Sequence, residues 1–156
     1  MQAHAFDTPE AAALGGLPGA DCRVVASATE GDDAYVLLDT GPAGRPYLYG
    51  VNVARADGGW VEGTSGNGPG WTCTDPEREL GTATAWGEAP KGADRVRAAF
   101  GDDAREAAAS DGIYLVAWWR VPCGPDDYPS VEAYRIGGRW VPDPSKELIR
   151  ELRRMM

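Results

Sequence analysis

The stretch VNVARADGGWVE, at residues 51–62, decides the fold, and VEAYRIGGRWVP, at residues 131–142, repeats its pattern. Each has an alternating strand, then a Gly-Gly pair, then a return strand with a tryptophan near its start, Trp60 or Trp140. Glycine adopts positive φ angles without steric cost, and a tight hairpin turn needs such angles. The two stretches therefore predict antiparallel strands joined by short turns, with large aromatic side chains beside the turns.

Short apolar runs bounded by Gly, Pro and Asp extend this pattern along most of the chain. Besides the return strand after Gly59, strands are predicted at residues 22–29, 34–40, 46–54, 82–87, 95–100, 104–109, 113–121, 130–136 and 139–141. A short helix is predicted at residues 9–14, capped by Thr8 or Asp7. A second helix begins at Pro144 after a capping Asp143, and Leu148, Ile149 and Leu152 form its apolar side. The expected fold is mainly β, an antiparallel β-sandwich or partly closed barrel of about eight to ten strands with a short helix near each terminus.

The segment IYLVAWWRV, at residues 113–121, is apolar at nearly every position. Such a run is typical of a central strand that is covered on both faces. Adjacent strand residues point to opposite faces, so Trp118 and Trp119 must lie on different sides of the sheet. One of them is expected in the core, and the other is available for a pocket or a second layer.

Residues 63–75 (GTSGNGPGWTCTD) form the longest stretch without hydrophobic periodicity. This stretch predicts a linker or a functional loop, so the chain divides into a helix-plus-meander half at 1–63, a connection at 64–80 and a second β half at 81–156. Asn67 and Trp71 are candidate contact residues, and Trp71 is the strongest because no strand is predicted around it. The glycines do not form a phosphate-binding loop, since no Lys followed by Ser or Thr ends the segment.

The composition fits one globular unit: 156 residues are 43% hydrophobic and 25% charged, with a net charge of −9. Residues 1–80 carry 4 Arg against 12 Asp or Glu, a formal charge of −8, whereas the rest of the chain is nearly balanced. This distribution argues against nucleic-acid binding, which needs a basic stripe. The sequence has neither a signal-peptide pattern nor an apolar run long enough for a membrane span, so a cytoplasmic location without membrane contact is expected.

Cysteine and histidine give little material for metal binding or nucleophilic catalysis. The three cysteines, Cys22, Cys73 and Cys123, are widely spaced, and the single histidine is His4. Buried or idle thiols are expected, with one disulfide as the alternative, and the sequence does not choose the pair. The acidic pairs, such as Asp32-Asp33, fall in predicted turns. No metal site and no cofactor are predicted.

The aromatic residues are the sharpest compositional signal, with six Trp and six Tyr against two Phe. Trp60, Trp86, Trp118 and Trp140 are expected to fill β cores, whereas a polar tip suits other Trp and Tyr residues to half-exposed contact sites. Candidate contacts for a ligand or partner are Trp71, Asn67, Trp118, Trp119 and Tyr49.

Two functions fit these features. The first is a non-enzymatic binding protein that uses its acidic half and exposed aromatics to engage a basic partner protein, as an immunity or inhibitor protein does. The alternative is a small-molecule-binding β protein, including a biosynthetic enzyme that acts by shaping an apolar ligand. Its pocket would be lined by Tyr35, Tyr47, Tyr49, Tyr114, Trp86 and either Trp118 or Trp119.

The Ala-, Gly-, Asp- and Arg-rich chain, with TSGNGPGW and LVAWWRVP as its most distinctive segments, resembles small uncharacterised β-rich proteins of high-GC actinobacteria. That resemblance implies no activity. Residues 9–62, a helix followed by a meander that ends in the DGGW hairpin, resemble the cystatin-like and NTF2-like layout. This second resemblance implies a helix laid on a curved sheet, although the long helix of those folds is missing here.

Overall fold

The computed structural model describes residues 6–15, 22–42, 47–66, 68–124, 128–143 and 154–155. These residues form two antiparallel sheets that pack face to face, so the prediction of a mainly β, sandwich-like fold is confirmed, and neither sheet closes into a barrel. The predicted C-terminal helix falls largely on residues outside the described part. The elements are α1 (Pro9–Gly15), β1 (Arg23–Glu30), β2 (Asp33–Asp39), β3 (Leu48–Ala56), β4 (Gly59–Gly66), β5 (Gly70–Asp75), β6 (Leu80–Glu88), β7 (Ala93–Phe100), β8 (Asp103–Ser110), β9 (Ile113–Pro122), β10 (Ser130–Ile136) and β11 (Arg139–Pro142).

The first sheet is a meander with strand order β1-β2-β3-β4. Its β3–β4 hairpin turns at Asp57-Gly58, where Gly58 has φ +91°. Gly59 serves a different purpose, because a Cβ at this position would collide with the carbonyl oxygen of Phe6. That close approach lets the backbones of Phe6 and Trp60 exchange two hydrogen bonds, of 2.9 and 2.7 Å.

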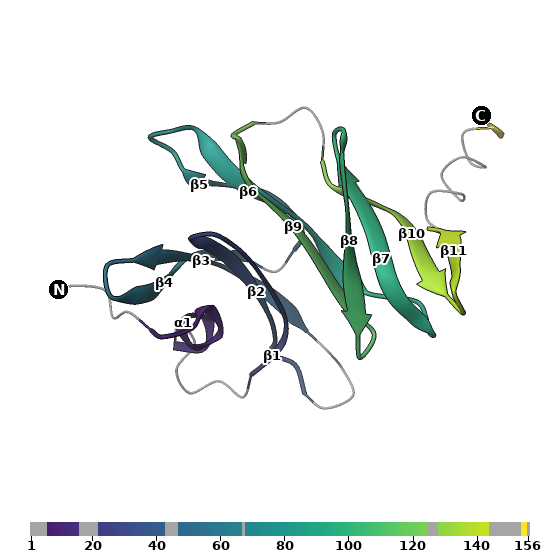
Figure 1. Cartoon of the computed structure of the whole chain (residues 1–156), viewed down its shortest axis with the longest axis horizontal. Helices are drawn as coiled ribbons and strands as arrows, with labels where there is room; N and C mark the ends of the chain where they lie inside the picture. Colours follow the sequence, from purple (N-terminus) through teal and green to yellow (C-terminus); the bar gives the residue numbers. More distant parts are fainter. Residues whose placement is uncertain are drawn as a thin grey trace.

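The helix α1 covers one face of the first sheet (Figure 1). Thr8 caps the helix, since its Oγ1 accepts a hydrogen bond of 3.1 Å from the backbone N–H of Ala11. The fully buried Ala12 and Ala13 let the helix approach the sheet closely, and they pack on Ala34, Val36, Leu38, Val51, Val53 and Trp60. This is the first of three apolar cores.

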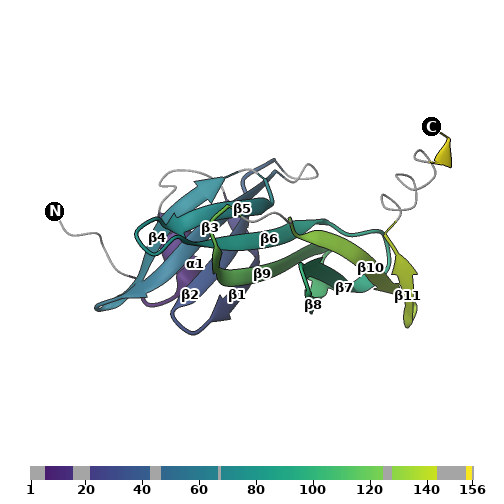
Figure 2. The same ribbon diagram turned by 90° about the horizontal axis from the view of Figure 1, so that it is seen from above.

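The second sheet has strand order β11-β10-β7-β8-β9-β6-β5, and it folds over on itself. Strands β8 and β9 pair only beside their shared turn, at Ala109–Tyr114 and Ser110–Ile113. Beyond the turn β8 leaves β9, and the layer containing β7 and β10 packs onto β6 and β9. Figure 2 shows the β10–β11 hairpin at the end of the molecule opposite to α1. The core inside this fold contains Ala83, Ala85, Val96, Ala98, Tyr114, Val116, Trp118 and Tyr134.

A third core joins the two sheets. It contains Tyr35 and Leu37 of β2 with Trp86, Ile113, Leu115 and Ala117 of β6 and β9. Trp86 Nε1 donates a hydrogen bond of 3.1 Å to the Tyr35 hydroxyl, so both polar tips are satisfied in the interior. The first six residues of β9 are buried, and they alternate between the second and third cores. The prediction of a central strand covered on both faces is thus confirmed.

The prediction of an irregular segment at residues 63–75 is wrong. Strand β4 continues to Gly66, and β5 pairs with β6 along Gly70–Asp75. The glycines hid this arrangement because they weaken a strand pattern without preventing an extended backbone. Residues 71–74 (WTCT) carry strand formers whose burial alternates, which is the signature of a strand with one face exposed to solvent.

The expectation of idle thiols is wrong for two of the three cysteines. Cys73 on β5 forms a disulfide with Cys123, which follows β9, with their Cα atoms 5.3 Å apart. The backbone N–H of Cys123 also donates to the carbonyl of Glu79, in the turn between β5 and β6. Cys22 is a free, half-buried thiol. The edge strand β5 is therefore held covalently as well as by its hydrogen bonds to β6.

Candidate functional site

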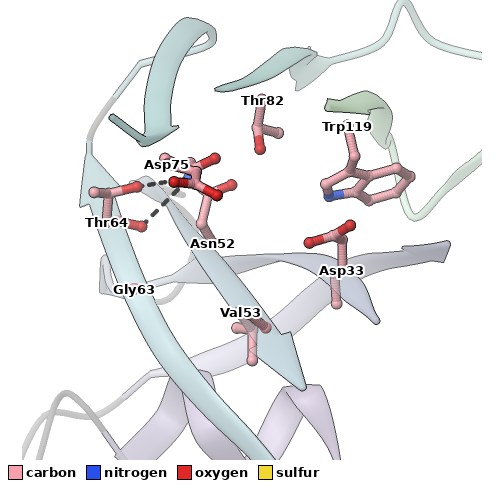
Figure 3. Close-up of a pocket in the computed structure, with 11 residues that line it drawn as sticks. Asp33, Asn52, Val53, Gly63, Thr64, Asp75, Thr82 and Trp119 are labelled. Carbon is pink, nitrogen blue, oxygen red and sulfur yellow. Dashed lines mark hydrogen bonds between the residues drawn. The ribbon is translucent and has the colours of Figure 1, made fainter. Parts of the chain in front are cut away.

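A cleft of about 260 Å³ opens between the two sheets, where β2, β3 and β4 face β5, β6 and β9 (Figure 3). The side chains of Asn52, Asp75, Thr82, Trp119 and Asp33 surround a common space, and the nitrogen-bearing edge of the Trp119 indole is turned toward it. The complete lining consists of Asp33, Ala34, Asn52, Val53, Ala54, Gly63, Thr64, Thr74, Asp75, Thr82 and Trp119. The cleft thus combines one large aromatic with carboxylate, amide and hydroxyl groups from six strands.

Three β-bulges meet at this cleft. The register of β3 and β4 shifts so that Gly63 and Thr64 oppose Asn52. In β5 the extra residue is Thr74, and in β9 it is Arg120. A bulge bends its strand and redirects side chains, and bulges are over-represented beside active sites. The bulges therefore bend three of the strands that line the cleft and redirect their side chains.

Arg120 has the most unusual backbone at the cleft, with φ +56° in the left-handed region. This conformation is costly for a residue with a Cβ, and glycine is the usual occupant of such a bulge position. The Arg120 side chain crosses to the first sheet, where its Nε lies 3.0 Å from an Asp33 carboxylate oxygen. The bulge thereby links the two walls of the cleft beside Trp119.

Two polar atoms of the lining are buried and have no hydrogen-bond partner among the described residues. They are Asn52 Oδ1, an acceptor, and Trp119 Nε1, a donor. The amide nitrogen of Asn52 donates to the Thr64 carbonyl oxygen at 3.4 Å and to Thr64 Oγ1 at 3.0 Å. A carbonyl can only accept, so the NH₂ group must face Thr64 and Oδ1 must point away from it.

Both carboxylates of the cleft have an arginine neighbour. Asp33 pairs with Arg120, and Asp75 lies 3.8 Å from the Nε of Arg78. Arg78 and Arg120 line an adjoining cavity of about 290 Å³. This second cavity shares Asp33, Thr74, Asp75 and Thr82 with the first, so the two are neighbouring lobes of one groove.

Of the four predicted contact residues that the structure describes, Trp119 alone is among the residues that line this cleft. Trp118 is 1% exposed and belongs to the second core, as its opposite orientation requires. The Tyr49 hydroxyl lies 2.6 Å from the Ser65 hydroxyl and lines no part of the groove. Asn67 lies outside the described residues.

The prediction that Trp71 stands in a strandless loop is wrong. Trp71 lies on β5 opposite Ala83 and is half-buried against the second core. Its indole nitrogen is buried, without a hydrogen-bond partner among the described residues. The residue is therefore part of the packing of the edge strand.

The predicted aromatic pocket is not assembled either. Tyr35 and Trp86 bond to each other between the sheets, while Tyr114 packs edge-to-face on Tyr134, with ring centroids 5.9 Å apart. Burial raises the pKa of Tyr35, Tyr114 and Tyr134, so these hydroxyls stay protonated near neutral pH. Tyr47 is more than half exposed. Trp86 and Tyr114 do line a separate cavity of about 280 Å³ with Tyr128 and Pro129.

Sequence reasoning missed the polar residues of the cleft, above all Asn52 and Asp33. Asn52 interrupts the run VNVAR, and asparagine is depleted in strands, so its position inside a strand was the available signal. The sequence predicts Asp33 in a turn, whereas it is the first residue of β2. The convergence of three bulges depends on registers between distant strands, which no local pattern encodes.

Within the described residues, no group of three or more His, Cys, Asp or Glu side chains is placed to hold a metal ion. None of the helices in the described part of the chain is long and apolar enough to cross a membrane. Comparisons of the chain with protein-family models, with curated proteins and with solved structures found no match.

Proposed function

We propose that this protein is a non-enzymatic binding protein that holds a small polar molecule in the cleft between its two sheets. The observation that carries the proposal is a buried donor and a buried acceptor, both unpartnered among the described residues, in one cleft beside a half-buried tryptophan. Buried polar groups are normally hydrogen-bonded, and a bound molecule is one explanation for an exception. The two lobes, of about 260 and 290 Å³, lie just below the roughly 300–1,000 Å³ of ligand pockets, so the ligand is small.

The test is binding measured on the full chain with two cleft variants and one matched control. Trp119→Ala and Asn52→Ala each remove one part of the cleft, whereas Trp140→Phe alters a tryptophan on β11 that lines none of the described cavities. Ligand-observed NMR against a mixed panel of small molecules should give binders that both cleft variants weaken and the control retains. Urea titrations of each variant establish that it is folded. Small molecules that bind both cleft variants as tightly as they bind the parent would contradict the proposal.

A second proposal follows from charge. The first 80 residues carry a formal charge of −8, which would attract a basic partner protein. Nearby arginines partly neutralise this negative charge. The ion pairs are Arg23–Asp39, Arg55–Asp32 and Arg105–Glu30. An electrostatic partner recovered at low salt should dissociate as the ionic strength rises. A partner held equally well at high salt would contradict this version.

The disulfide bears on the cellular location. Cys73–Cys123 supports an oxidising compartment in place of the expected cytoplasm, because disulfides persist there and are rare in reducing cytosol. Mass spectrometry of protein alkylated at the moment of cell lysis measures the state of the two thiols in their native compartment. Full alkylation of Cys73 and Cys123 would favour the cytoplasm.

A further inference from the structure

The chemistry of the cleft narrows the class of its ligand. Asn52 Oδ1 needs a donor, and Trp119 Nε1–H needs an acceptor. An unpaired buried polar group is destabilising, so a guest that pairs both atoms recovers that cost. A hydroxyl group offers one donor hydrogen and two acceptor lone pairs, and it therefore complements both atoms.

A single water molecule has the same hydrogen-bonding capacity, but the space is much larger than one water. At about 30 Å³ per molecule of liquid water, a cleft of about 260 Å³ corresponds to roughly eight or nine waters. The remaining lining continues the same chemistry, because it includes the hydroxyl-bearing residues Thr64, Thr74 and Thr82. The lining is thus suited to several hydroxyl groups at once.

The charges of the groove favour a neutral guest. The Asp33 carboxylate is paired with Arg120 at 3.0 Å, and Asp75 neighbours Arg78 at 3.8 Å. A cation would have to compete with these guanidinium groups, and an anion would meet the carboxylates. Lone pairs of the carboxylates that face the cleft can still accept hydrogen bonds from hydroxyl groups.

Trp119 supplies the apolar component. Its indole is half-buried against the inter-sheet core, which fixes the ring, and Figure 3 shows it forming one side of the cleft above Asp33. The indole edge that faces the cleft carries one N–H donor between apolar ring C–H groups, and beside amide and carboxylate acceptors it suits a ring that carries several hydroxyl groups on its own edge. We infer that the ligand is a neutral sugar, with one ring in the Trp119 lobe and a second unit in the lobe beside Arg78. This inference rests on the proposed small-molecule function.

Binding must involve a small movement of side chains. Asn52 Oδ1 and Trp119 Nε1 are both closed off from solvent, so a hydroxyl group reaches them only when the cleft opens slightly. Rotamer changes of this kind are common on binding. The fluorescence of Trp119 should change as the sugar enters.

The experiment compares probes of four chemical classes on the full oxidised chain. The neutral sugars are glucose, galactose, N-acetylglucosamine, cellobiose and lactose; the other probes are putrescine, glycine and benzoate. Saturation-transfer NMR and tryptophan fluorescence should detect at least one sugar, with the disaccharide binding more tightly than its monosaccharide. Trp119→Phe keeps a flat ring but removes the N–H donor, so it should weaken the sugar about three- to tenfold while urea stability is maintained. Trp140→Phe is the matched control and should bind as the parent does.

The outcomes separate the two proposals. If putrescine, glycine or benzoate binds in a manner that depends on Trp119 and no sugar does, the sugar inference is overturned and the small-molecule function stands. If a sugar binds equally well to the parent and to both Trp119→Phe and Asn52→Ala, the assignment to this cleft is overturned. If none of the sugars binds, the sugar inference is overturned, and the small-molecule function is then decided by the mixed panel.

Discussion

At the scale of single residues, the site depends on an arginine in a conformation that favours glycine. Arg120 occupies the bulge of β9 with φ +56°, and its side chain reaches Asp33 on the opposite sheet. A left-handed conformation costs a residue with a Cβ roughly 1–2 kcal/mol. Arg120 therefore links the two walls of the cleft at some cost in the free energy of unfolding.

This cost can be measured with two substitutions that remove the same ion pair. Arg120→Gly relieves the backbone strain, whereas Arg120→Ala keeps it. Because the lost ion pair is common to both, we expect the glycine variant to be the more stable by about 1 kcal/mol, after allowance for the greater freedom of unfolded glycine. Urea denaturation with equal m-values provides the comparison. An alanine variant as stable as the glycine variant would mean that Arg120 is not left-handed in solution.

Asp39, at the end of β2, makes a pH-dependent contribution to the free energy of unfolding. The backbone N–H groups of Gly41 and Tyr47 donate to its carboxylate at 2.9 and 3.0 Å, and with Arg23 they lower its pKa below the usual 3.8. A depressed pKa in the folded state means that the ionised group stabilises the fold above pH 3.8 and that this gain is lost as the pH falls through the folded-state value.

Replacement of Asp39 by asparagine removes the titrating charge. We expect Asp39→Asn to lower the free energy of unfolding by about 1–2 kcal/mol near neutral pH, because charged hydrogen bonds are stronger than neutral ones. The difference from the parent should shrink below pH 3.8. Urea midpoints measured across this range test it. If the difference in the free energy of unfolding between the variant and the parent stays unchanged in acid, the loss comes from altered packing and hydrogen-bond geometry and not from the missing charge.

At the scale of elements, the strand β5 contributes Thr74 and Asp75 to the cleft but lies at the edge of its sheet. The Cys73–Cys123 disulfide begins at the residue before Thr74, two positions before Asp75, and closes a loop with a sequence separation of 50. Closing a loop of this size stabilises a protein by up to about 4 kcal/mol in the chain-entropy account, and by 2–4 kcal/mol in typical cases. The disulfide thus supports one wall of the site.

The double variant Cys73→Ser/Cys123→Ser should therefore unfold at lower urea concentration, with a loss of about 2–4 kcal/mol. Hydrogen exchange should increase first in β5 and in the turn that precedes β6, because these elements lose their tether to the end of β9. Cys22→Ser is the matched control, since this thiol is free. Equal stability of the double variant and the control would show that hydrogen bonding to β6 alone holds β5.

The elements also show what a local pattern can predict. Strand β9 was predictable because its run of apolar residues is continuous, and both hairpins were predictable because their turns are glycine-rich. Strand β5, which pairs with the next strand, β6, was not predicted from the sequence. The four glycines among residues 63–70 weaken the strand pattern of this segment. Asn52, Asp33 and Thr74 come together only through sheet registers and the packing of two sheets. Residues of this kind are set by tertiary structure and leave no pattern in the neighbouring sequence.

At the scale of the whole molecule, three apolar cores share their strands. Strand β2 serves both the helix-covered core and the inter-sheet core, and β9 serves the inter-sheet core and the folded second sheet. No core can therefore lose its structure without exposing a face of a strand that belongs to another core. The sheets are expected to unfold as one unit.

Calorimetry tests this cooperativity. The oxidised protein should show one transition with equal calorimetric and van't Hoff enthalpies. Leu37→Ala removes a fully buried side chain from the inter-sheet core and should cost about 2–5 kcal/mol. It should shift that single transition downward without dividing it. Two separated transitions, in the parent or in the variant, would mean that the sheets fold independently.

The disulfide also gives the chain an unusual connectivity. Between Cys73 and Cys123 the polypeptide is a closed covalent ring, which carries β6, β7, β8 and β9, while the first sheet and the β10–β11 hairpin leave it as two tails. A single proteolytic cut in the exposed turn at Gly101-Asp102 would open the ring without releasing a fragment, whereas a cut in either tail would release one. The part of the second sheet that lies within the ring thus stays covalently connected after a single cut of its backbone.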